Sequence, residues 1–326
     1  MKKKLLIIAA ANNFHFIKDI ADAMRDEFEI ETFGISQDSL ASAAGSLREK
    51  FDSADIIWLE WADGFNMDLL ILGNLYDKKV ILRIHRYELF TPRTLELLTR
   101  LTESGNYKKI DKLVFVSETV RQIGVSKFPW MENSVVIPNL IDHTKFPLVK
   151  KDKGYNLLFL GRVSYVKNLP LCLTMFHELL KLDSNYKLHI VGEISDPELL
   201  YYLENFISKT RINGNVIWHG RVKNDKLPEL MKDMNYIVCS SIFESQGMGI
   251  IEGMSAGLKP VVFNFPGAEN LYPKKWLWSD RTDFVGNILS SDYNPQEYRD
   301  YVKCKFSIQE NLSVYTNLIN DTLKGE

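Results

Sequence analysis

Short apolar runs alternate with longer amphipathic stretches along almost the whole chain. Apolar runs bounded by turn-forming residues are typical of buried strands, and the amphipathic stretches between them are typical of helices that cover a sheet. In the first half, the runs predicted as strands are Lys4–Ala10, Glu29–Gly34, Asp55–Trp61, Lys79–Ile84, Lys112–Val116 and Ser134–Ile137. This alternation predicts an α/β fold built on a parallel sheet.

The pattern breaks at Pro138–Tyr155, a lysine-rich stretch with little periodicity that is typical of an interdomain linker. Beyond it, the predicted strands are Asn156–Leu160, Lys187–Val191, Asn215–Trp218, Tyr236–Cys239 and Lys259–Phe263. We therefore predict two Rossmann-like, doubly wound domains, residues 1–145 and 146–305. Residues 306–326 are expected to form a closing C-terminal helix with Ser307 at its N-cap.

Ligands of open parallel sheets bind beyond the carboxyl ends of the strands. Two such domains facing each other across a cleft would therefore place the functional residues in the loops that follow strands.

The composition excludes several classes of protein. A chain of 326 residues with 45% hydrophobic and 25% charged residues is globular and suggests roughly two domains of ~150 residues. Its 40 basic and 42 acidic residues give a net charge of -2, which provides no basic surface for nucleic acid. The three cysteines, Cys172, Cys239 and Cys304, lie far apart, which argues against a disulfide framework or a structural zinc site and indicates a reducing compartment.

The first residues, MKKKLLIIAAA, have the basic and apolar parts of a secretion signal. Their apolar run is short, and the residues that follow are more typical of a turn and a helix, so we predict a cytoplasmic protein. No later stretch has the ~18 apolar residues of a membrane span. The basic cluster Lys150, Lys151 and Lys153 is either a solvated linker or a peripheral contact with anionic lipid.

The segment Phe243–Val262 carries the most specific pattern. Gly247 and Gly249 remove side chains where the chain turns into a helix, so backbone N–H groups and the positive helix end can face an anionic or hydroxyl-rich ligand. Glu252 lies one turn into that helix. Two glutamates alone, Glu244 and Glu252, could be ordinary solvated carboxylates, but the surrounding glycines favour a binding site.

A second candidate site follows the strand that ends at Gly161 and delivers Arg162 and Lys167 into a loop. Two cations there suit a diphosphate, because fixed cations can stabilise its negative charge. The alternative is a surface Arg and Lys in a polar loop. Because the sequence contains no Asp-x-Asp pair to hold a divalent ion, we predict that no metal is required.

His85 follows the predicted strand Lys79–Ile84. A neutral imidazole can hydrogen-bond a ligand hydroxyl or relay a proton, whereas the alternative is a core histidine satisfied by the backbone. The neighbouring Arg83 and Arg86 could face an anionic acceptor or make solvated salt bridges.

Two further strand ends point to the same side of the first predicted domain. Glu60 and Asp63 follow a strand and could line an acceptor site. After the first strand comes Ala10–Asn13, where an asparagine can adopt a left-handed turn.

Together these segments resemble the retaining GT-B glycosyltransferases of family 4, the glycosyl transferases group 1, whose Glu-x7-Glu signature matches Glu244 and Glu252. The resemblance implies that His85, Arg162, Lys167 and Glu244 are catalytic or face the donor sugar. It assigns donor contacts to Gly161, Arg162, Lys167, Arg221, Val222, Gly247, Met248, Gly249, Ile250 and Glu252, with the diphosphate on Arg162 and Lys167 and the ribose on Glu252.

The function that the resemblance implies is retaining transfer of a sugar from a nucleotide-diphosphate donor, UDP- or GDP-linked, to a glycan, glycolipid or other polysaccharide-precursor acceptor. No cofactor or metal is expected beyond that donor. A nucleotide-sugar epimerase, a phosphorylase or a non-catalytic glycan-binding subunit could share the architecture, since fold alone does not fix the reaction.

Overall fold

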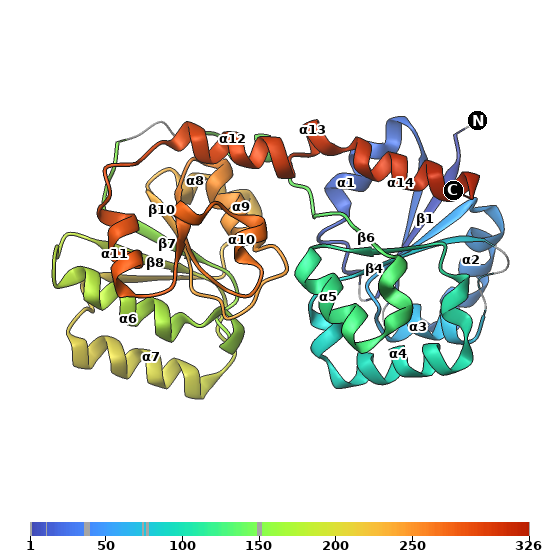
Figure 1. Ribbon diagram of the computed structural model, residues 1–326, viewed down its shortest axis with the longest axis horizontal. Helices are drawn as coiled ribbons and strands as arrows, with labels where there is room; N and C mark the ends of the chain where they lie inside the picture. The colour runs from blue at the N-terminus through green and yellow to red at the C-terminus, as the bar shows by residue number, and fades with distance from the viewer. Residues whose placement is uncertain are drawn as a thin grey trace. The chain divides into compact units, whose positions relative to one another are not determined.

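The computed structural model describes residues 2–10, 12–35, 40–73, 75, 78–148 and 152–325. The chain forms two compact units. The first comprises Met1–Ile141 and Ile308–Glu326, and the second comprises Asp142–Ser307. Each unit has a parallel sheet covered by helices on both faces (Figure 1).

The sheet of the first unit has the strand order β2-β1-β3-β4-β5-β6. Its strands are β1 (Lys4–Ala10), β2 (Glu29–Ile35), β3 (Ile56–Glu60), β4 (Lys79–Ile84), β5 (Lys112–Phe115) and β6 (Val135–Val136). Its α-helices are α1 (Lys18–Ala23), α2 (Leu40–Ser53), α3 (Gly64–Ile71), α4 (Pro92–Ser104), α5 (Glu118–Lys127), α13 (Ile308–Asn311) and α14 (Ser313–Lys324). The first unit also has short 3-10 helices, η1 (Met24–Asp26), η3 (Tyr87–Phe90), η4 (Asn106–Lys109) and η5 (Pro129–Asn133).

The sheet of the second unit has the order β12-β11-β10-β7-β8-β9. Its strands are β7 (Asn156–Leu160), β8 (Lys187–Val191), β9 (Val216–Gly220), β10 (Tyr236–Cys239), β11 (Lys259–Phe263) and β12 (Leu277–Trp278). Its α-helices are α6 (Leu169–Leu180), α7 (Pro197–Thr210), α8 (Leu227–Met231), α9 (Met248–Ser255), α10 (Ala268–Leu271), α11 (Arg281–Leu289) and α12 (Pro295–Phe306). The 3-10 turns are η6 (His143–Lys145), η7 (Tyr165–Lys167), η8 (Asn224–Lys226) and η9 (Lys274–Trp276).

The predicted strands are confirmed. The central strands, such as β3 and β10, form continuous apolar runs because a parallel sheet buries them on both faces, whereas the edge strands β6 and β9 are largely exposed. The largest shift is at β9, which begins at Val216 and continues to Gly220. The sequence pattern missed β12, a two-residue strand too short to show any periodicity. The predicted closing helix is two helices, α13 and α14, and both belong to the first unit.

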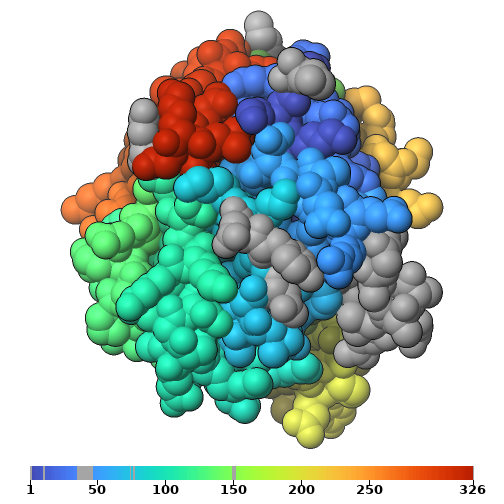
Figure 2. Space-filling view, turned by 90° about the vertical axis from the view of Figure 1, so that its right-hand side faces the viewer, coloured from blue at the N-terminus to red at the C-terminus, as the bar shows by residue number. Residues whose placement is uncertain are grey.

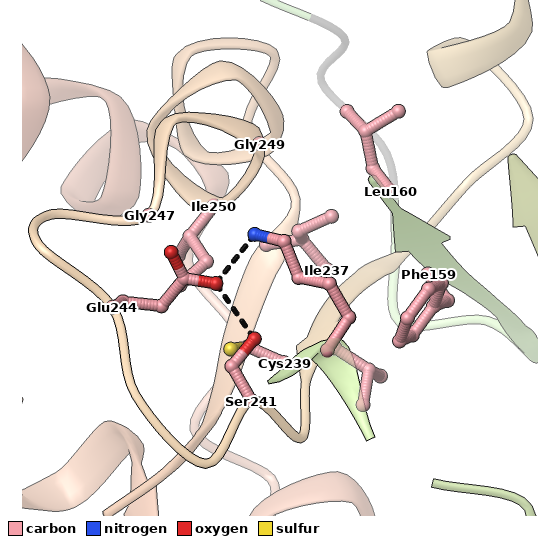
Figure 3. Close-up of a pocket in the computed structure, with 11 residues that line it drawn as sticks. Phe159, Leu160, Ile237, Cys239, Ser241, Glu244, Gly247, Gly249 and Ile250 are labelled. Carbon is pink, nitrogen blue, oxygen red and sulfur yellow. Dashed lines mark hydrogen bonds and ion pairs between the residues drawn. The ribbon is translucent and has the colours of Figure 1, made fainter. Parts of the chain in front are cut away.

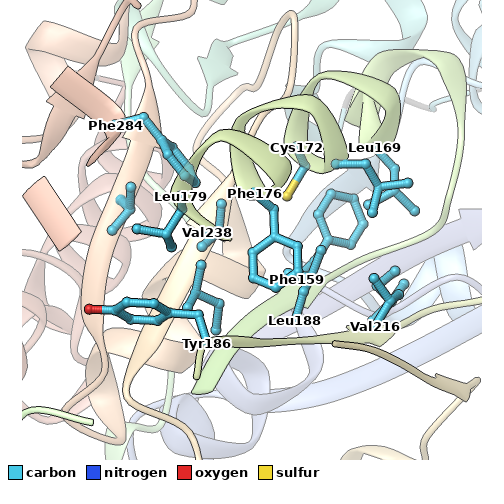
Figure 4. Close-up of a cluster of buried hydrophobic side chains, with 14 of the residues drawn as sticks. Phe159, Leu169, Cys172, Phe176, Leu179, Tyr186, Leu188, Val216, Val238 and Phe284 are labelled. Carbon is cyan, nitrogen blue, oxygen red and sulfur yellow. The ribbon is translucent and has the colours of Figure 1, made fainter. Parts of the chain in front are cut away.

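The core of the second unit forms where α6 packs on the sheet (Figure 4). Leu169, Leu173 and Phe176 recur at helical spacing on one face of α6 and are fully buried. They contact Phe159 of β7 and Leu188 of β8 within one apolar cluster. This packing fixes β7, and with it the loop that leaves the carboxyl end of β7.

The helix α14 completes the core of the first unit. Its Tyr315 and Ile319 are buried in one cluster with Ile17 and Ile20, which lie at the start of α1. Figure 2 shows the red surface of the C-terminal residues beside the blue surface of the amino-terminal ones. None of the helices built from the described residues combines the length and the apolar character that a membrane span requires.

A buried arginine fastens α14 to β4. The Nη1 of Arg83, which is 0% exposed, donates to the Tyr315 hydroxyl at 2.8 Å, and that hydroxyl donates to the Pro138 carbonyl at 2.9 Å. The Nη2 of Arg83 donates to Asn139 Oδ1 at 2.9 Å. The expectation that Arg83 faces an anionic acceptor or a solvated salt bridge is therefore wrong, because its guanidinium is satisfied inside the first unit.

We expect Tyr315→Phe to lower the free energy of unfolding by about 1 to 3 kcal/mol, because it leaves a buried guanidinium and a partly buried carbonyl short of one partner each. Tyr201→Phe is the matched control, since Tyr201 is 71% exposed and its loss should change stability by less than about 0.5 kcal/mol. Urea unfolding of both variants measures the difference. Equal stabilities would show that the hydroxyl of Tyr315 does not hold α14 in place.

Candidate active site

A pocket lies at the carboxyl ends of β7 and β10, where the strand order of the second unit reverses direction. Such reversal points are the usual ligand sites of open α/β sheets. The pocket is open to solvent, and its empty space, including that open part, is about 290 Å³. Its lining comes from the ends of β7 and β10, the segments that follow these strands and the start of α9, namely Phe159, Leu160, Lys167, Ile237, Val238, Cys239, Ser241, Glu244, Gly247, Gly249 and Ile250.

The loop after β7 is held by main-chain contacts to the loop after β8. The Gly161 N–H donates to the Val191 carbonyl, and the Val163 N–H donates to the Glu193 carbonyl, both at 2.9 Å. A Cβ at Gly192 would lie 1.9 Å from the Gly161 carbonyl oxygen, so only glycine fits there. The backbone that leads to Lys167 is therefore fixed by close approach of two loops.

The main chain at Lys167 is held in place by Ser240, the residue that follows β10. The Ser240 hydroxyl contacts the carbonyls of Lys167 and Asn168 at 3.0 and 2.9 Å. Asn168 adopts a left-handed conformation, with φ of 50° and ψ of 49°, and the chain turns there into α6. Asparagine tolerates this conformation better than most residues, so the turn that presents Lys167 follows from its neighbour.

The two charged groups of the pocket form an ion pair. Lys167 Nζ contacts Glu244 Oε1, and the same oxygen accepts a hydrogen bond from the Ser241 hydroxyl at 2.7 Å (Figure 3). The Glu244 side chain is 11% exposed and that of Lys167 is 28% exposed. A cation held by a carboxylate at the rim of a pocket can meet a ligand phosphate, while the carboxylate can meet a hydroxyl.

Glycines let α9 begin directly against the sheet. Gly247 has a left-handed φ of 79° and is the N-cap of α9. A Cβ at Gly249 would lie 2.8 Å from the Leu160 carbonyl oxygen, and one at Gly253 would lie 2.7 Å from Ile237 Cβ. The Tyr272 hydroxyl donates to the Gln246 carbonyl at 2.5 Å and fixes the approach to the helix. These glycines therefore let the backbone at the start of α9 come close to the sheet beside the pocket.

Glu252 lies one turn into α9. Burial raises the pKa of its carboxyl to about 7, against a smaller lowering by the charge of Lys167. A carboxyl with this pKa gains or loses its charge near neutral pH, when a polar ligand or a cation approaches.

The structure thus brings Lys167, Glu244, Gly247, Gly249 and Ile250 together around one pocket. The lining does not include the other residues assigned to the donor, which are Gly161, Arg162, Arg221, Val222, Met248 and Glu252. Of these, Gly161 and Arg162 belong to the loop that carries Lys167, and Met248 and Glu252 belong to α9.

Arg162 and Arg221 are exposed, and Val222 is partly buried. Arg221 Nη1 lies 3.9 Å from Glu193 Oε2, in an ion pair open to solvent at the carboxyl ends of β8 and β9. The assignment of these residues to donor contacts stays a prediction.

His85 lies in the first unit and is 3% exposed. Its Nε2 lies 2.9 Å from Glu60 Oε1, and its ring stacks on Trp61 with 4.0 Å between ring centroids. Its partner is thus a buried carboxylate rather than the backbone. The idea that Glu60 lines an acceptor surface is wrong, because Glu60 is 0% exposed. Asp63 caps α3, since its side chain accepts from the Asn66 N–H at 3.0 Å.

Sequence reasoning missed Ser241, which holds Glu244, although its position after the strand β10 was a usable signal. The left-handed turn expected after the first strand is confirmed at Asn12, with φ of 55°. Ala11 lies outside the described residues, as do Lys150 and Lys151 of the basic cluster. Within the described ranges, no three His, Cys, Asp or Glu side chains form a group that could hold a metal ion.

Residues 141–273, which contain the whole pocket, match the family model of the glycosyl transferases group 1. Alpha-monoglucosyldiacylglycerol synthase of Streptococcus pneumoniae is 26% identical over 221 residues, which are 62% of this chain and 48% of that protein. GDP-mannose:cellobiosyl-diphosphopolyprenol alpha-mannosyltransferase of Xanthomonas oryzae is 23% identical over 252 residues, which are 73% of this chain and 63% of that protein. The chain thus matches about half to three-fifths of the length of these relatives.

Among solved structures, HepE of Anabaena in complex with UDP and glucose superimposes with a TM-score of 0.77 at 14% identity, over 98% of this chain and 100% of that one. With the two parallel sheets and their helices, this similarity shows that the chain has the two-domain α/β GT-B fold. The matches to the group 1 family model and to named glycosyltransferases support a glycosyltransferase.

We expect Gly249→Ala to lower the free energy of unfolding by about 1 to 3 kcal/mol, because the new methyl group meets a main-chain carbonyl that cannot move aside. Gly286→Ala, in the interior of α11, is the matched control. A Cβ added at Gly286 would have no neighbour within 4 Å among the described residues outside its own helix turn, so this variant should raise stability by up to about 1 kcal/mol. Denaturant unfolding measures both variants, and a neutral Gly249→Ala would contradict the close approach of α9 to β7.

The raised pKa of Glu252 predicts a pH-dependent loss of stability. The folded chain keeps this proton up to about pH 7, whereas the unfolded chain releases it near the ordinary value of 4.5, so stability falls as pH rises through this window and is constant above it. We expect Glu252→Gln to remove this component. Unfolding of both proteins at about pH 5 and about pH 8 measures it, and an unchanged difference between the two pH values would contradict the assignment.

Proposed function

We propose that the protein is a retaining glycosyltransferase that moves a sugar from a nucleotide-diphosphate donor to a carbohydrate or lipid-linked glycan acceptor. The observation that carries the proposal is the Lys167–Glu244 pair beside the glycine-rich start of α9, at the reversal point of the second sheet. This pocket lies wholly within the segment that matches the glycosyl transferases group 1. Retention of configuration is taken from the Glu-x7-Glu pattern of Glu244 and Glu252.

In this proposal, Lys167 and Arg162 stabilise the charge that develops on the leaving diphosphate. Fixed cations act best where the negative charge grows in the transition state, because they need no reorganisation at that moment. Glu244, whose carboxylate is already oriented by Ser241, contacts the donor sugar. Glu252 accepts hydrogen bonds from the ribose hydroxyls in its ionised form.

The donor is proposed to be a UDP- or GDP-sugar. The structure of HepE contains UDP and glucose, and the Xanthomonas relative is named for GDP-mannose. Two relatives are named for a diacylglycerol product and a diphosphopolyprenol substrate, which supports a lipid-linked acceptor and peripheral contact with a membrane. We further propose a cytoplasmic location and a reaction without a divalent metal.

Thermal unfolding with UDP-, GDP- and ADP-sugars, each in the presence of a chelator, tests the proposal. A ligand that binds the folded state raises the melting temperature in proportion to the logarithm of its concentration over its dissociation constant. We expect one nucleotide series to stabilise the protein in the chelator. Stabilisation that requires Mg²⁺ would remove the metal-independent mechanism, and no stabilisation by any of them would remove the donor assignment.

We expect Lys167→Met to raise the barrier to sugar transfer by roughly 2 to 4 kcal/mol, which is about 30- to 1000-fold in turnover. Glu252→Ala should chiefly weaken nucleotide binding. Lys181→Met is the matched control, since Lys181 makes an exposed ion pair at the end of α6, outside the pocket lining. Calorimetric titration and initial rates with the best donor measure these effects.

Full turnover and unchanged donor affinity in both pocket variants would contradict the site assignment. Equal losses in Lys167→Met and Lys181→Met would instead point to a general effect of net charge.

A further inference from the structure

A buried carboxylate at the end of β3 has three hydrogen-bond donors around it. Trp58 Nε1 donates to Glu60 Oε2 at 2.8 Å. Arg83 Nη2 and His85 Nε2 lie 3.0 and 2.9 Å from Glu60 Oε1. Glu60 and Arg83 are each 0% exposed, so these contacts are made away from solvent.

The charge on Glu60 decides which atom of His85 carries the proton. Burial by itself raises the pKa of Glu60, but the charge of Arg83 and the hydrogen bonds from His85 and Trp58 outweigh it and hold the pKa below the ordinary value. An ionised carboxylate can only accept, so Nε2 of His85 must donate. Arg83 Nε, 3.4 Å from the same nitrogen, then acts as a neighbouring charge, because a protonated Nε2 has no lone pair to offer.

His85 itself is neutral. Burial lowers its pKa, and the hydrogen bond to Glu60 only partly offsets that effect. A neutral imidazole with its proton on Nε2 has a lone pair on Nδ1. No described residue bonds to this Nδ1.

The ring cannot turn freely to exchange its two nitrogens. It stacks on Trp61, at 4.0 Å between centroids, and Phe16 lies beside both rings, with its centroid 5.1 Å from that of His85 and 5.6 Å from that of Trp61. The His85 main-chain N–H donates to Glu88 Oε1 at 3.2 Å, and the same oxygen accepts from the Ala62 N–H at 3.2 Å. Both the backbone and the ring of His85 are therefore held in one orientation.

We propose that Glu60 is a positioning residue that fixes His85 in its Nε2–H form, so that Nδ1 accepts a hydrogen bond from a hydroxyl of a bound carbohydrate. The inference rests on the proposed function for its ligand, but not for its geometry. A lone pair at Nδ1 attracts a neutral hydroxyl and repels a phosphate or carboxylate oxygen. The ligand group at this strand end is therefore a sugar hydroxyl rather than an anionic group.

Nitrogen NMR of the full-length, ¹⁵N-labelled protein without ligand tests the tautomer directly. The chain has 6 histidines, and the signal absent from His85→Ala identifies His85. We expect Nε2 to be protonated and Nδ1 to be unprotonated at neutral pH. A proton on Nδ1 would overturn the proposal whatever reaction the enzyme performs, and failure of the proposed transfer reaction would leave this measurement unaffected.

Glu60→Gln then tests the role of the carboxylate. We expect it to shift His85 towards a mixture of tautomers. Glu88→Gln is the matched control, because it also removes a buried carboxyl, but one that contacts His85 only at its main-chain N–H, so the tautomer should stay the same. The rate at which the enzyme turns over the best donor, measured as UDP or GDP formed, should fall about 10- to 100-fold in Glu60→Gln. His85→Asn, which keeps an acceptor near the position of Nδ1, should retain more activity than His85→Ala.

The double variant Glu60→Gln/His85→Ala should be no slower than His85→Ala alone, because Glu60 acts through His85. Losses that multiply would overturn the positioning role. If Glu60→Gln does not fold, the wild-type tautomer and the order of the two His85 variants still decide the question.

Discussion

The close approach of backbone to backbone at the carboxyl end of β7 is the constraint on which the proposed site depends. Gly192 leaves room for the loop that carries Lys167, and Gly249 lets α9 begin against the Leu160 carbonyl. Without these two approaches, Lys167 and Glu244 would not meet at one pocket. The glycines are thus geometric requirements, and the charged residues supply the chemistry that the geometry makes possible.

In the first unit, a network of buried polar groups holds the ring of His85 in one orientation and, as we propose, in one tautomer. Glu60 and Arg83 are fully buried, and such charges are costly unless each is paired and hydrogen-bonded. Here Trp58, His85, Asn139 and Tyr315 satisfy them together. The network ties the orientation of His85 to α14, at the far end of the sequence, so the same contacts stabilise the fold and orient the candidate functional ring.

The sequence predicted the parts of the structure that depend on local pattern. Continuous apolar runs located β1 and β7, and the glycines around Glu244 located the start of α9. Contacts between segments that are far apart in the chain could not be predicted from local pattern. Arg83 and Tyr315 are 232 positions apart, so nothing in their local sequence shows that one binds the other or that α14 belongs to the first unit. The sequence places Glu60 at a strand end, but its burial depends on those long-range contacts.

Hydrogen exchange of the whole chain with and without UDP or GDP shows whether the loops after β7 and β10 and the start of α9 form one nucleotide-sugar site. We expect the bound nucleotide to slow exchange of the amides in residues 161–168 and 244–252 and to leave α7 unaffected. Binding that slows exchange only elsewhere in the chain, with these two segments unchanged, would contradict it.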